Sequence, residues 1–467
     1  MPSSAGSAAP PPLEGGGARP RLRRVLGLWD LILFGIVLVS PTGPLAFFGV
    51  LNERGRGHAA TSILLAMFAM LMTAVSYGRM ARAYPSAGSA FAYVGQEINP
   101  VLGYATGWGI MLDYLVFPAI AIIWIGQQMH VFFPAMPYWL CVTIFAGVIT
   151  GLNVQNVRMS ARVNLALTAG MGLIILIFLA AAARYVLGHP HGGGEFFTRP
   201  FYDPQTWSWK AIAASTSLGV LTYIGFDGIS TLAEEAREPR RHILQAAVLT
   251  CVAIGIICVL EVYAAQLVWP VSEPFPDLDT SFTFVAQRVW APLFGVVGFT
   301  LLVANFGSGM GAQAAAARLL YGMGRSGALP EWFFGRIEPK RRVPRNNVLL
   351  VGAIALFAAI VLPAVAGEAT GYELGANMLN FGALLAYMGV NAAAFMRYYW
   401  RAPEKRLVNA IAPAVGFVVC LLLWWNLNVR ARTFGVIWMA AGIAYGAWKT
   451  RWFRVNRLSF ESPAEIP

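Results

Sequence analysis

The sequence predicts an all-α polytopic membrane protein, and three observations support this fold class. Of its 467 residues, 57% are hydrophobic and only 12% are charged, a composition that excludes a soluble globular chain. Apolar stretches of about 20 residues, the length that crosses a bilayer as a helix, recur through nearly the whole sequence. The lysine and arginine residues are concentrated in alternate segments between these stretches, as the positive-inside rule requires of a membrane protein.

We predict twelve transmembrane helices, of which the first ten form two repeats of five. The repeats occupy residues 25–190 and 191–400, two further spans occupy 401–450, and cytoplasmic tails occupy 1–24 and 451–467. The first tail is expected to be disordered because it is rich in Pro, Gly and Ala. The predicted spans lie near residues 28–50, 59–80, 102–130, 138–155, 163–187, 211–232, 243–268, 289–317, 347–366, 374–396, 408–428 and 433–449.

The basic residues predict the orientation of the chain. When the N-terminus is placed in the cytoplasm, 26 of the 34 lysine and arginine residues fall on the cytoplasmic side, so both termini are expected to be cytoplasmic. This asymmetry explains the net charge of +12 without nucleic acid as a partner, and it also favours contact with the anionic head groups of the lipid bilayer. No Asn-x-Ser/Thr sequon occurs, which suits a bacterial cytoplasmic (inner) membrane.

The first span is interrupted near its middle by a run of helix-breaking residues, which are Ser40, Pro41, Thr42, Gly43 and Pro44. Each proline removes a backbone donor and crowds the carbonyl group four residues back, so a regular helix cannot continue through the run. One interpretation is a proline kink that neighbouring helices repair. The other is a pair of half-helices that meet at a binding site, and a matching break in the second half of the chain would favour it.

The third span carries an aspartate near its middle, Asp113, followed by Tyr114. A charged side chain at this depth is costly and rarely faces lipid. It marks either a ligand pathway or a buried hydrogen bond in which Tyr114 is a local companion, and the residues alone leave both interpretations open.

The sixth span contains the second break, in the run Tyr223, Ile224, Gly225, Phe226, Asp227 and Gly228. Two glycines three residues apart can mark a close contact between helices, but that does not account for the aspartate between them. Spans one and six each open a set of five spans and start on opposite sides of the membrane. The sequence therefore predicts a five-plus-five inverted repeat with broken helices one and six.

Smaller predictions concern other polar residues. Glu261 of the seventh span lies nearer the outer end, so its side chain is expected to reach the membrane interface. Asn391 and Asn426 are expected to form hydrogen bonds between helices. Residues 82–93 are expected to form a short helix at the interface. All four cysteines fall inside predicted spans, so we expect neither disulfides nor a metal cluster.

Several function classes lack their motifs in this sequence. No phosphate-binding loop is present, which argues against ATP-driven pumping. The five histidines show no zinc spacing, and the local sequence suggests no pairing of a nucleophile with a base. We therefore predict no catalytic residues, no metal, no cofactor and no enzymatic activity.

Four spaced motifs extend over about residues 20–455. They are residues 83–93, residues 107–115 around Asp113, residues 225–235 around Asp227, and residues 318–330. Together they resemble the motifs of the amino acid–polyamine–organocation (APC) superfamily of permeases, and most closely its bacterial putrescine importers and amino acid permeases.

The resemblance implies the five-plus-five fold with two extra C-terminal helices and a central site between spans one, three, six and eight. In this family the unwound parts of spans one and six bind the substrate, and here these parts are residues 40–44 and 224–227. Related arginine–agmatine and putrescine–ornithine exchangers carry a carboxylate where this chain has Asp227, and there it serves cation recognition and proton sensing.

The residues and the resemblance together predict a secondary active transporter for a small amine-bearing solute, either an amino acid or a polyamine such as putrescine. Asp113 and Asp227 would hold the two ammonium groups of a diamine, whereas half-helix N-termini would hold the carboxylate of an amino acid. The predicted substrate-binding residues are Ser40, Pro41, Thr42, Gly43, Asp113, Tyr114, Tyr223, Ile224, Gly225, Phe226 and Asp227.

Protons are the expected coupling ion. Sodium coupling in this fold usually needs hydroxyl ligands in the inner half of span eight, where this chain has four alanines at residues 314–317. Proton coupling needs a membrane carboxylate that gains and loses a proton, and Asp227, Asp113 and Glu261 are the candidates in that order. The alternatives are exchange without a driving ion, a passive channel and a structural membrane subunit.

Overall fold

A computed structural model describes residues 24–155, 157–189, 193–270, 273–275, 281–366, 368–427 and 429–449. Within these residues the secondary structure is helical, and the one β-like pairing is an isolated parallel bridge between Leu26 and Ala236. The predicted all-α fold class is confirmed. The expected tails, 1–24 and 451–467, lie outside the described residues except for Arg24.

Among the described residues, eleven helical segments are long and apolar enough to cross a membrane, and α18 (Val429–Lys449) follows them as a less apolar helix. The predicted count of twelve spans and the inverted repeat therefore stay predictions. In chain order the eleven segments are α1 (Leu28–Val39) with η1 (Gly43–Phe47) and α2 (Phe48–Arg54), α3 (Ala59–Ala83), α5 (Pro100–Phe132), α6 (Tyr138–Gln155), α7 (Val157–Gly188), α9 (Trp209–Gly219) with η2 (Val220–Tyr223) and α10 (Gly228–Thr231), α11 (Pro239–Val268), α13 (Leu293–Arg325), α15 (Arg345–Ala366), α16 (Glu368–Phe395) and α17 (Leu407–Trp425).

Both predicted breaks are present, and each contains a residue with a positive φ angle. Helix α1 ends at Val39, and Ser40 follows with φ 65° and ψ 114° before the chain enters the short 3-10 helix η1. In the sixth span, η2 ends at Tyr223 and α10 begins at Gly228, with Gly225 at φ 115° between them. That φ value is readily available only to glycine, which explains why this residue type stands at the second break.

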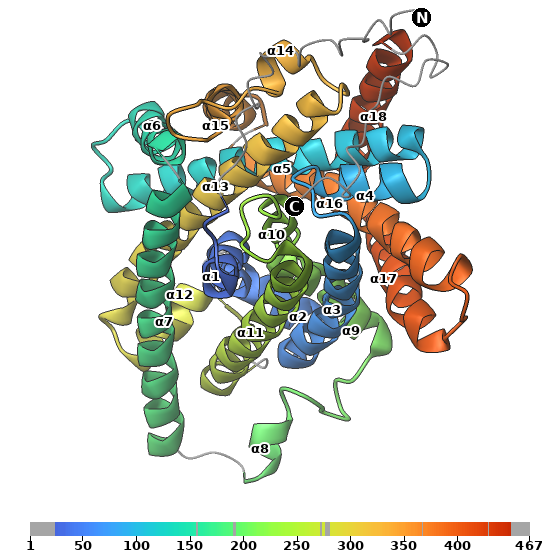
Figure 1. Ribbon diagram of the computed structural model, residues 1–467. Helices are drawn as coiled ribbons and strands as arrows, with labels where there is room; N and C mark the ends of the chain where they lie inside the picture. The colour runs from blue at the N-terminus through green and yellow to red at the C-terminus, as the bar shows by residue number, and fades with distance from the viewer. Residues whose placement is uncertain are drawn as a thin grey trace, which may run out of the picture.

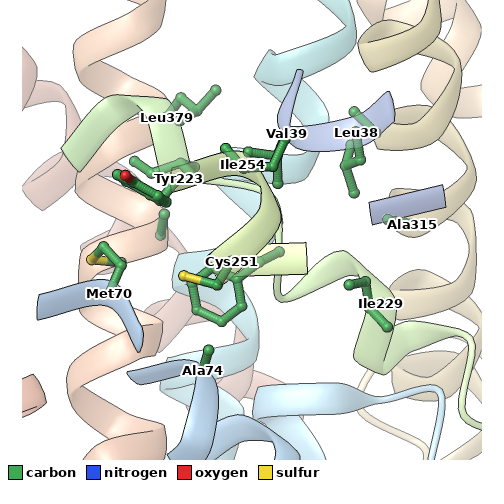
Figure 2. Packing of buried hydrophobic residues seen from close by; sticks show 14 of the residues in the cluster. Leu38, Val39, Met70, Ala74, Tyr223, Ile229, Cys251, Ile254, Ala315 and Leu379 are labelled. Atoms are coloured by element: carbon green, nitrogen blue, oxygen red, sulfur yellow. The ribbon is translucent and has the colours of Figure 1, made fainter. Parts of the chain in front are cut away.

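The two broken segments lie in the middle of the bundle, where α1 contacts α10 (Figure 1). Small residues permit this approach, because a Cβ atom added at Gly228 would overlap the side chain of Leu38. Figure 2 shows part of the buried apolar core around the breaks, including Leu38, Tyr223, Cys251 and Ala315. The interruptions are therefore enclosed by protein, as broken backbone at membrane depth requires.

Four short helices connect the spans, namely α4 (Ser89–Glu97), α8 (Glu195–Thr198), α12 (Ser281–Val289) and α14 (Glu331–Phe334), and a π-helical turn, η3 (Met396–Trp400), ends α16. The short helix expected over residues 82–93 forms as α4, shifted toward the C-terminus, and its place at the membrane interface stays a prediction. Its residues are almost all buried, because α4 packs against α5 with the backbones of Gly95 and Gly103 in close contact.

The smaller predictions have mixed outcomes. All four cysteines are buried and free. Asn391 on α16 donates a hydrogen bond to the Thr73 hydroxyl on α3 at 3.1 Å, so its interhelical role is confirmed. Asn426 is exposed and donates instead to the Leu422 carbonyl of its own helix, because it lies at the C-terminal end of α17, beyond the neighbouring helices.

The orientation of the chain can be tested by cysteine accessibility. In Figure 1, α8 and α14 lie at opposite ends of the molecule, as the predicted topology requires of segments on opposite sides of the membrane. We expect that Gly193→Cys, placed just before α8, reacts with a membrane-impermeant maleimide from outside intact cells. The native cysteines are buried and provide a low background, and reaction only from the cytoplasmic side would refute the topology. The other segment expected outside contains Asp279, which lies outside the described residues.

Candidate functional site

The two breaks lie side by side and bring Asp227 next to the middle of α5. Helices η1 and η2 are in contact, and the backbone of Gly225 lies against the end of α1, where an added Cβ would be 3.6 Å from the Leu38 carbonyl oxygen. Asp227 is the residue immediately before α10, and its side chain is fully buried. This arrangement places a carboxylate at the junction of the two broken spans.

Asp227 accepts hydrogen bonds from two tyrosine hydroxyl groups on different helices. The hydroxyl of Tyr387 on α16 donates to Oδ1 at 2.8 Å, and the hydroxyl of Tyr114 on α5 donates to Oδ2. The backbone is secured as well, because the Ser230 hydroxyl donates to the Asp227 carbonyl oxygen at 2.6 Å. Two donors on the carboxylate hold it in one orientation.

Asp113 is also fully buried, but neither of its carboxylate oxygens has a hydrogen-bond partner within the part of the chain that the structure describes. It precedes Tyr114 on α5, and a Cβ added at Gly382 of α16 would lie 3.4 Å from the Asp113 Cβ. A buried carboxylate without a partner costs several kcal/mol. A structure that retains such a group leaves it available for a cation or a proton.

Aromatic rings from four other positions enclose the two carboxylates. The Tyr77 ring packs edge-on against Phe226 and Tyr387 with centroid distances of 5.6 Å in both cases, and against Tyr93 at 6.3 Å. Phe226 and Tyr387 are 5.3 Å apart. The hydroxyl groups of Tyr77 and Tyr93 have no hydrogen-bond partner among the described residues, so they too can serve a ligand.

We name this set the acidic–aromatic cluster; it consists of Tyr77, Tyr93, Asp113, Tyr114, Phe226, Asp227 and Tyr387. No ion pair joins either carboxylate to a lysine, arginine or histidine within the described ranges. The cluster therefore combines two acidic groups, aromatic faces and spare hydroxyl groups without a positive charge of its own. Aromatic faces and carboxylates both attract organic cations.

The sequence-predicted site residues divide into three groups in the structure. Asp113, Tyr114, Phe226 and Asp227 come together in the acidic–aromatic cluster. Ser40, Pro41, Thr42 and Gly43 form the first break, with Ile224 and Gly225 in the second. Tyr223 does not face the cluster, because its hydroxyl donates to the Ile63 carbonyl oxygen on α3 at 3.2 Å.

Three cluster members were not among the predicted site residues, namely Tyr77, Tyr93 and Tyr387. Tyr93 lies in the 83–93 motif, so the motif was a usable signal for it. Tyr77 and Tyr387 occupy the middle of long apolar helices, α3 and α16. A tyrosine there is an ordinary buried residue in the sequence. Only the packing of the helices shows that the Tyr387 hydroxyl donates to Asp227 and that the Tyr77 ring packs against Phe226 and Tyr387.

The prediction that Glu261 reaches the membrane interface is wrong. Its side chain is fully buried within α11, and both carboxylate oxygens lack a hydrogen-bond partner among the described residues. Distance along the span suggested an interfacial position, but α7, α12 and α13 supply apolar side chains that cover this turn of α11.

Ion pairs hold together the end of the molecule that the topology assigns to the cytoplasm. Arg318 on α13 pairs with the buried Glu235, and Arg325 pairs with Glu234 at 2.6 Å. The Glu235 carbonyl oxygen also accepts hydrogen bonds from the backbone N–H groups of Val25 and Leu26 at 2.9 and 3.0 Å. These contacts join the start of span one, the end of span six and span eight, so they close that side of the bundle.

A second charged group reinforces the same end. Glu97 at the end of α4 pairs with Arg397 at 3.0 Å and with Arg401 at 3.2 Å, and it accepts a hydrogen bond from the Tyr84 hydroxyl at 2.8 Å. Burial and this hydrogen bond to Glu97 raise the pKa of Tyr84 to about 12. Tyr84 therefore stays a neutral donor. The ion pairs of Glu97 connect α4 to the end of α16.

The chain resembles known transport proteins over nearly its whole length. A family model described as amino acid permease matches residues 30–452. The low-affinity putrescine importer PlaP of Escherichia coli is 33% identical over 444 residues, which are 94% of this chain and 96% of that protein. A methylthioribose transporter of Bacillus subtilis is 25% identical over 457 residues, and the branched-chain amino acid permease BcaP of the same species is 23% identical over 455 residues. Both alignments cover 90% of this chain and 92% of the relative.

Proposed function

We propose that this chain, which belongs to the amino acid permease family, transports a diamine of the putrescine type. Membership makes the protein a multi-pass transporter of amino acids or polyamines in the bacterial cytoplasmic membrane, and not an enzyme. The proposal adds the substrate class, alternating access around the acidic–aromatic cluster, and coupling to protons with both termini in the cytoplasm.

The pair of buried carboxylates carries this proposal. Asp113 and Asp227 lie in one aromatic enclosure without a protein cation among the described residues. A diamine brings two ammonium groups and neutralises both carboxylates, whereas a zwitterionic amino acid brings a third carboxylate with its single ammonium group. Because an uncompensated buried charge is costly, the cluster suits the diamine better.

The backbone at the breaks supports the same choice. An amino acid carboxylate would need free N–H groups at the half-helix ends. At the first break Pro41 and Pro44 have no N–H group, and the N–H groups of Gly43 and Leu45 already donate to the carbonyl oxygens of Ser40 and Thr42 at 3.1 Å.

At the second break, backbone N–H groups are likewise already engaged in hydrogen bonds. The N–H groups of Gly228, Ile229 and Ser230 each donate to the carbonyl oxygen three residues earlier in the chain, at 2.9, 3.2 and 2.9 Å. The first residues of α10 therefore have few donors left for a substrate carboxylate, and the side chain at this helix start is itself the carboxylate of Asp227.

Uptake into proteoliposomes tests the proposal. We expect purified full-length protein to take up putrescine when an interior-alkaline pH gradient is imposed, and unlabelled diamines to compete far better than n-butylamine, leucine or arginine. Saturable, gradient-driven uptake would also argue against a passive channel and a structural subunit, and uptake that requires a counter-substrate would favour the exchanger. Uptake of leucine that no diamine inhibits would contradict the diamine assignment.

A further inference from the structure

Glu261 is a second buried acidic site, separate from the acidic–aromatic cluster. It lies on α11 about two turns before the helix ends at Val268. Its side chain is fully buried, and neither carboxylate oxygen has a hydrogen-bond partner in the described part of the chain. Among the described residues this carboxylate makes no hydrogen bond or ion pair, so a glutamine or methionine would replace it without loss of such a contact.

Glu261 faces a small cavity at the outer side of the first break. The cavity has a volume of about 10 Å³, which is about the space of one water molecule. Thr42 and Leu45 of the first span line one side of it, and Phe178 of α7, Phe282 of α12 and Thr300 of α13 line the rest. The first span and α11 thus both contribute walls to this cavity.

The cavity is connected to the break by hydrogen bonds. The hydroxyl groups of Thr42 and Ser40 are 2.9 Å apart, so they form a short polar link from the cavity to the end of α1. One turn before Glu261, the Cys258 thiol donates to the Pro41 carbonyl oxygen at 3.1 Å. The position of the break and the surroundings of Glu261 are thus coupled by direct contacts.

No positive charge offsets Glu261 within the described residues. A titratable neighbour that interacts with it is Cys258, on the same helix. On the elements packed against α11, the charged and titratable side chains nearest this half of the molecule are exposed or engaged elsewhere. Arg184 on α7 is exposed, Arg288 on α12 pairs with Glu273, Tyr223 donates to Ile63, and His58 contacts the backbone of Gly55 and Asp203.

We propose that Glu261 is the proton-binding site of this transporter, and that the packing of the outer half of span one sets its occupancy. In the closed arrangement the buried group holds its proton as a neutral carboxylic acid, because a lone buried carboxylate is costly. When η1 and α2 move away from α11, water enters the cavity, the O–H bond breaks, and the proton passes to water while the carboxylate remains. The proposal rests on the proposed transport function and moves Glu261 ahead of Asp227 and Asp113 as the coupling residue.

The variant Glu261→Gln tests the proposal, because glutamine keeps the shape of the neutral acid but cannot release a proton. In proteoliposomes with an interior-alkaline gradient of about one pH unit and the membrane potential clamped at zero, one proton per solute supports about tenfold accumulation, and wild-type protein is expected to accumulate putrescine. We expect Glu261→Gln to equilibrate putrescine without accumulation, while exchange of internal for external putrescine stays within about twofold of wild type. The matched control Glu53→Gln, at an exposed carboxylate on α2, should behave as wild type in both assays.

Gradient-driven accumulation by Glu261→Gln at the wild-type level would overturn the proposal. If wild-type protein moves leucine and no diamine, the substrate assignment fails separately, and the same comparison with leucine still decides the role of Glu261. A solute-independent measurement is modification by dicyclohexylcarbodiimide, which reacts with protonated carboxyl groups in apolar surroundings. We expect mass spectrometry to find Glu261 modified at about pH 7, both in wild-type protein and in the Glu53→Gln control. A Glu261 that stays unmodified in both proteins would also overturn the proposal.

Discussion

Asp227→Asn is expected to reduce the affinity for putrescine by about 30-fold or more and to abolish measurable uptake at low substrate concentrations. The substitution keeps the size of the side chain but removes the charge that two tyrosine hydroxyl groups orient, those of Tyr114 and Tyr387. Truncating one partner of a buried charge pair typically costs about 2–5 kcal/mol. Uptake kinetics and equilibrium binding to the purified variant measure this effect.

The control for this prediction must separate loss of binding from loss of folding. Tyr387→Phe removes one hydrogen bond to Asp227 while leaving the carboxylate, so we expect a smaller loss of about 10-fold, since hydrogen bonds to charged groups contribute about 1.5–3 kcal/mol. Both variants should elute as monodisperse protein at the wild-type position. An Asp227→Asn protein that transports putrescine with wild-type affinity would show that the second break does not bind the substrate.

Asp113→Asn is expected to change selectivity more than stability. Asp113 is a buried polar group without a hydrogen-bond partner among the described residues, and replacing it relieves the cost of burying it in the empty protein, so the melting temperature in detergent should stay equal or rise. The same change removes one of the two acidic positions for a diamine, so putrescine affinity should fall by about tenfold or more. The affinity for n-butylamine, which has one ammonium group, should change much less because Asp227 is retained.

Competition of putrescine and n-butylamine for binding to Asp113→Asn measures the selectivity, and thermal unfolding measures the stability. Two results would contradict the account of Asp113. An equal loss for both amines would show that Asp113 does not select the second ammonium group. A large fall in melting temperature would show that Asp113 has a structural partner.

The breaks in the fold were predictable from the sequence because their causes are local. Pro41 and Pro44 cannot continue a helix in any surroundings, and Gly225 adopts a φ of 115° that few other residues tolerate. Asp113 and Asp227 were predictable for a related reason, since a charged residue inside a membrane span is rare and can be recognised from the sequence without knowing its neighbours.

The rest of the site depends on packing between distant segments. Tyr77 and Tyr387 are separated from Asp227 by 150 and 160 positions along the chain, and nothing in the apolar pattern of α3 or α16 shows that both helices turn a tyrosine toward the second break. The position of Glu261 along its span suggested an interfacial side chain, but depth along a helix does not reveal which helices cover it. The burial of α4 was missed for the same reason, because the approach of Gly95 and Gly103 is a tertiary contact.

The central claim is that the acidic–aromatic cluster binds two ammonium groups at once, and isothermal titration calorimetry of the purified full-length protein tests it most directly. The account predicts one site per chain, with putrescine bound at least about tenfold more tightly than n-butylamine and with no detectable heat from leucine. Equal affinities for the two amines, or tight binding of leucine with none of putrescine, would contradict it.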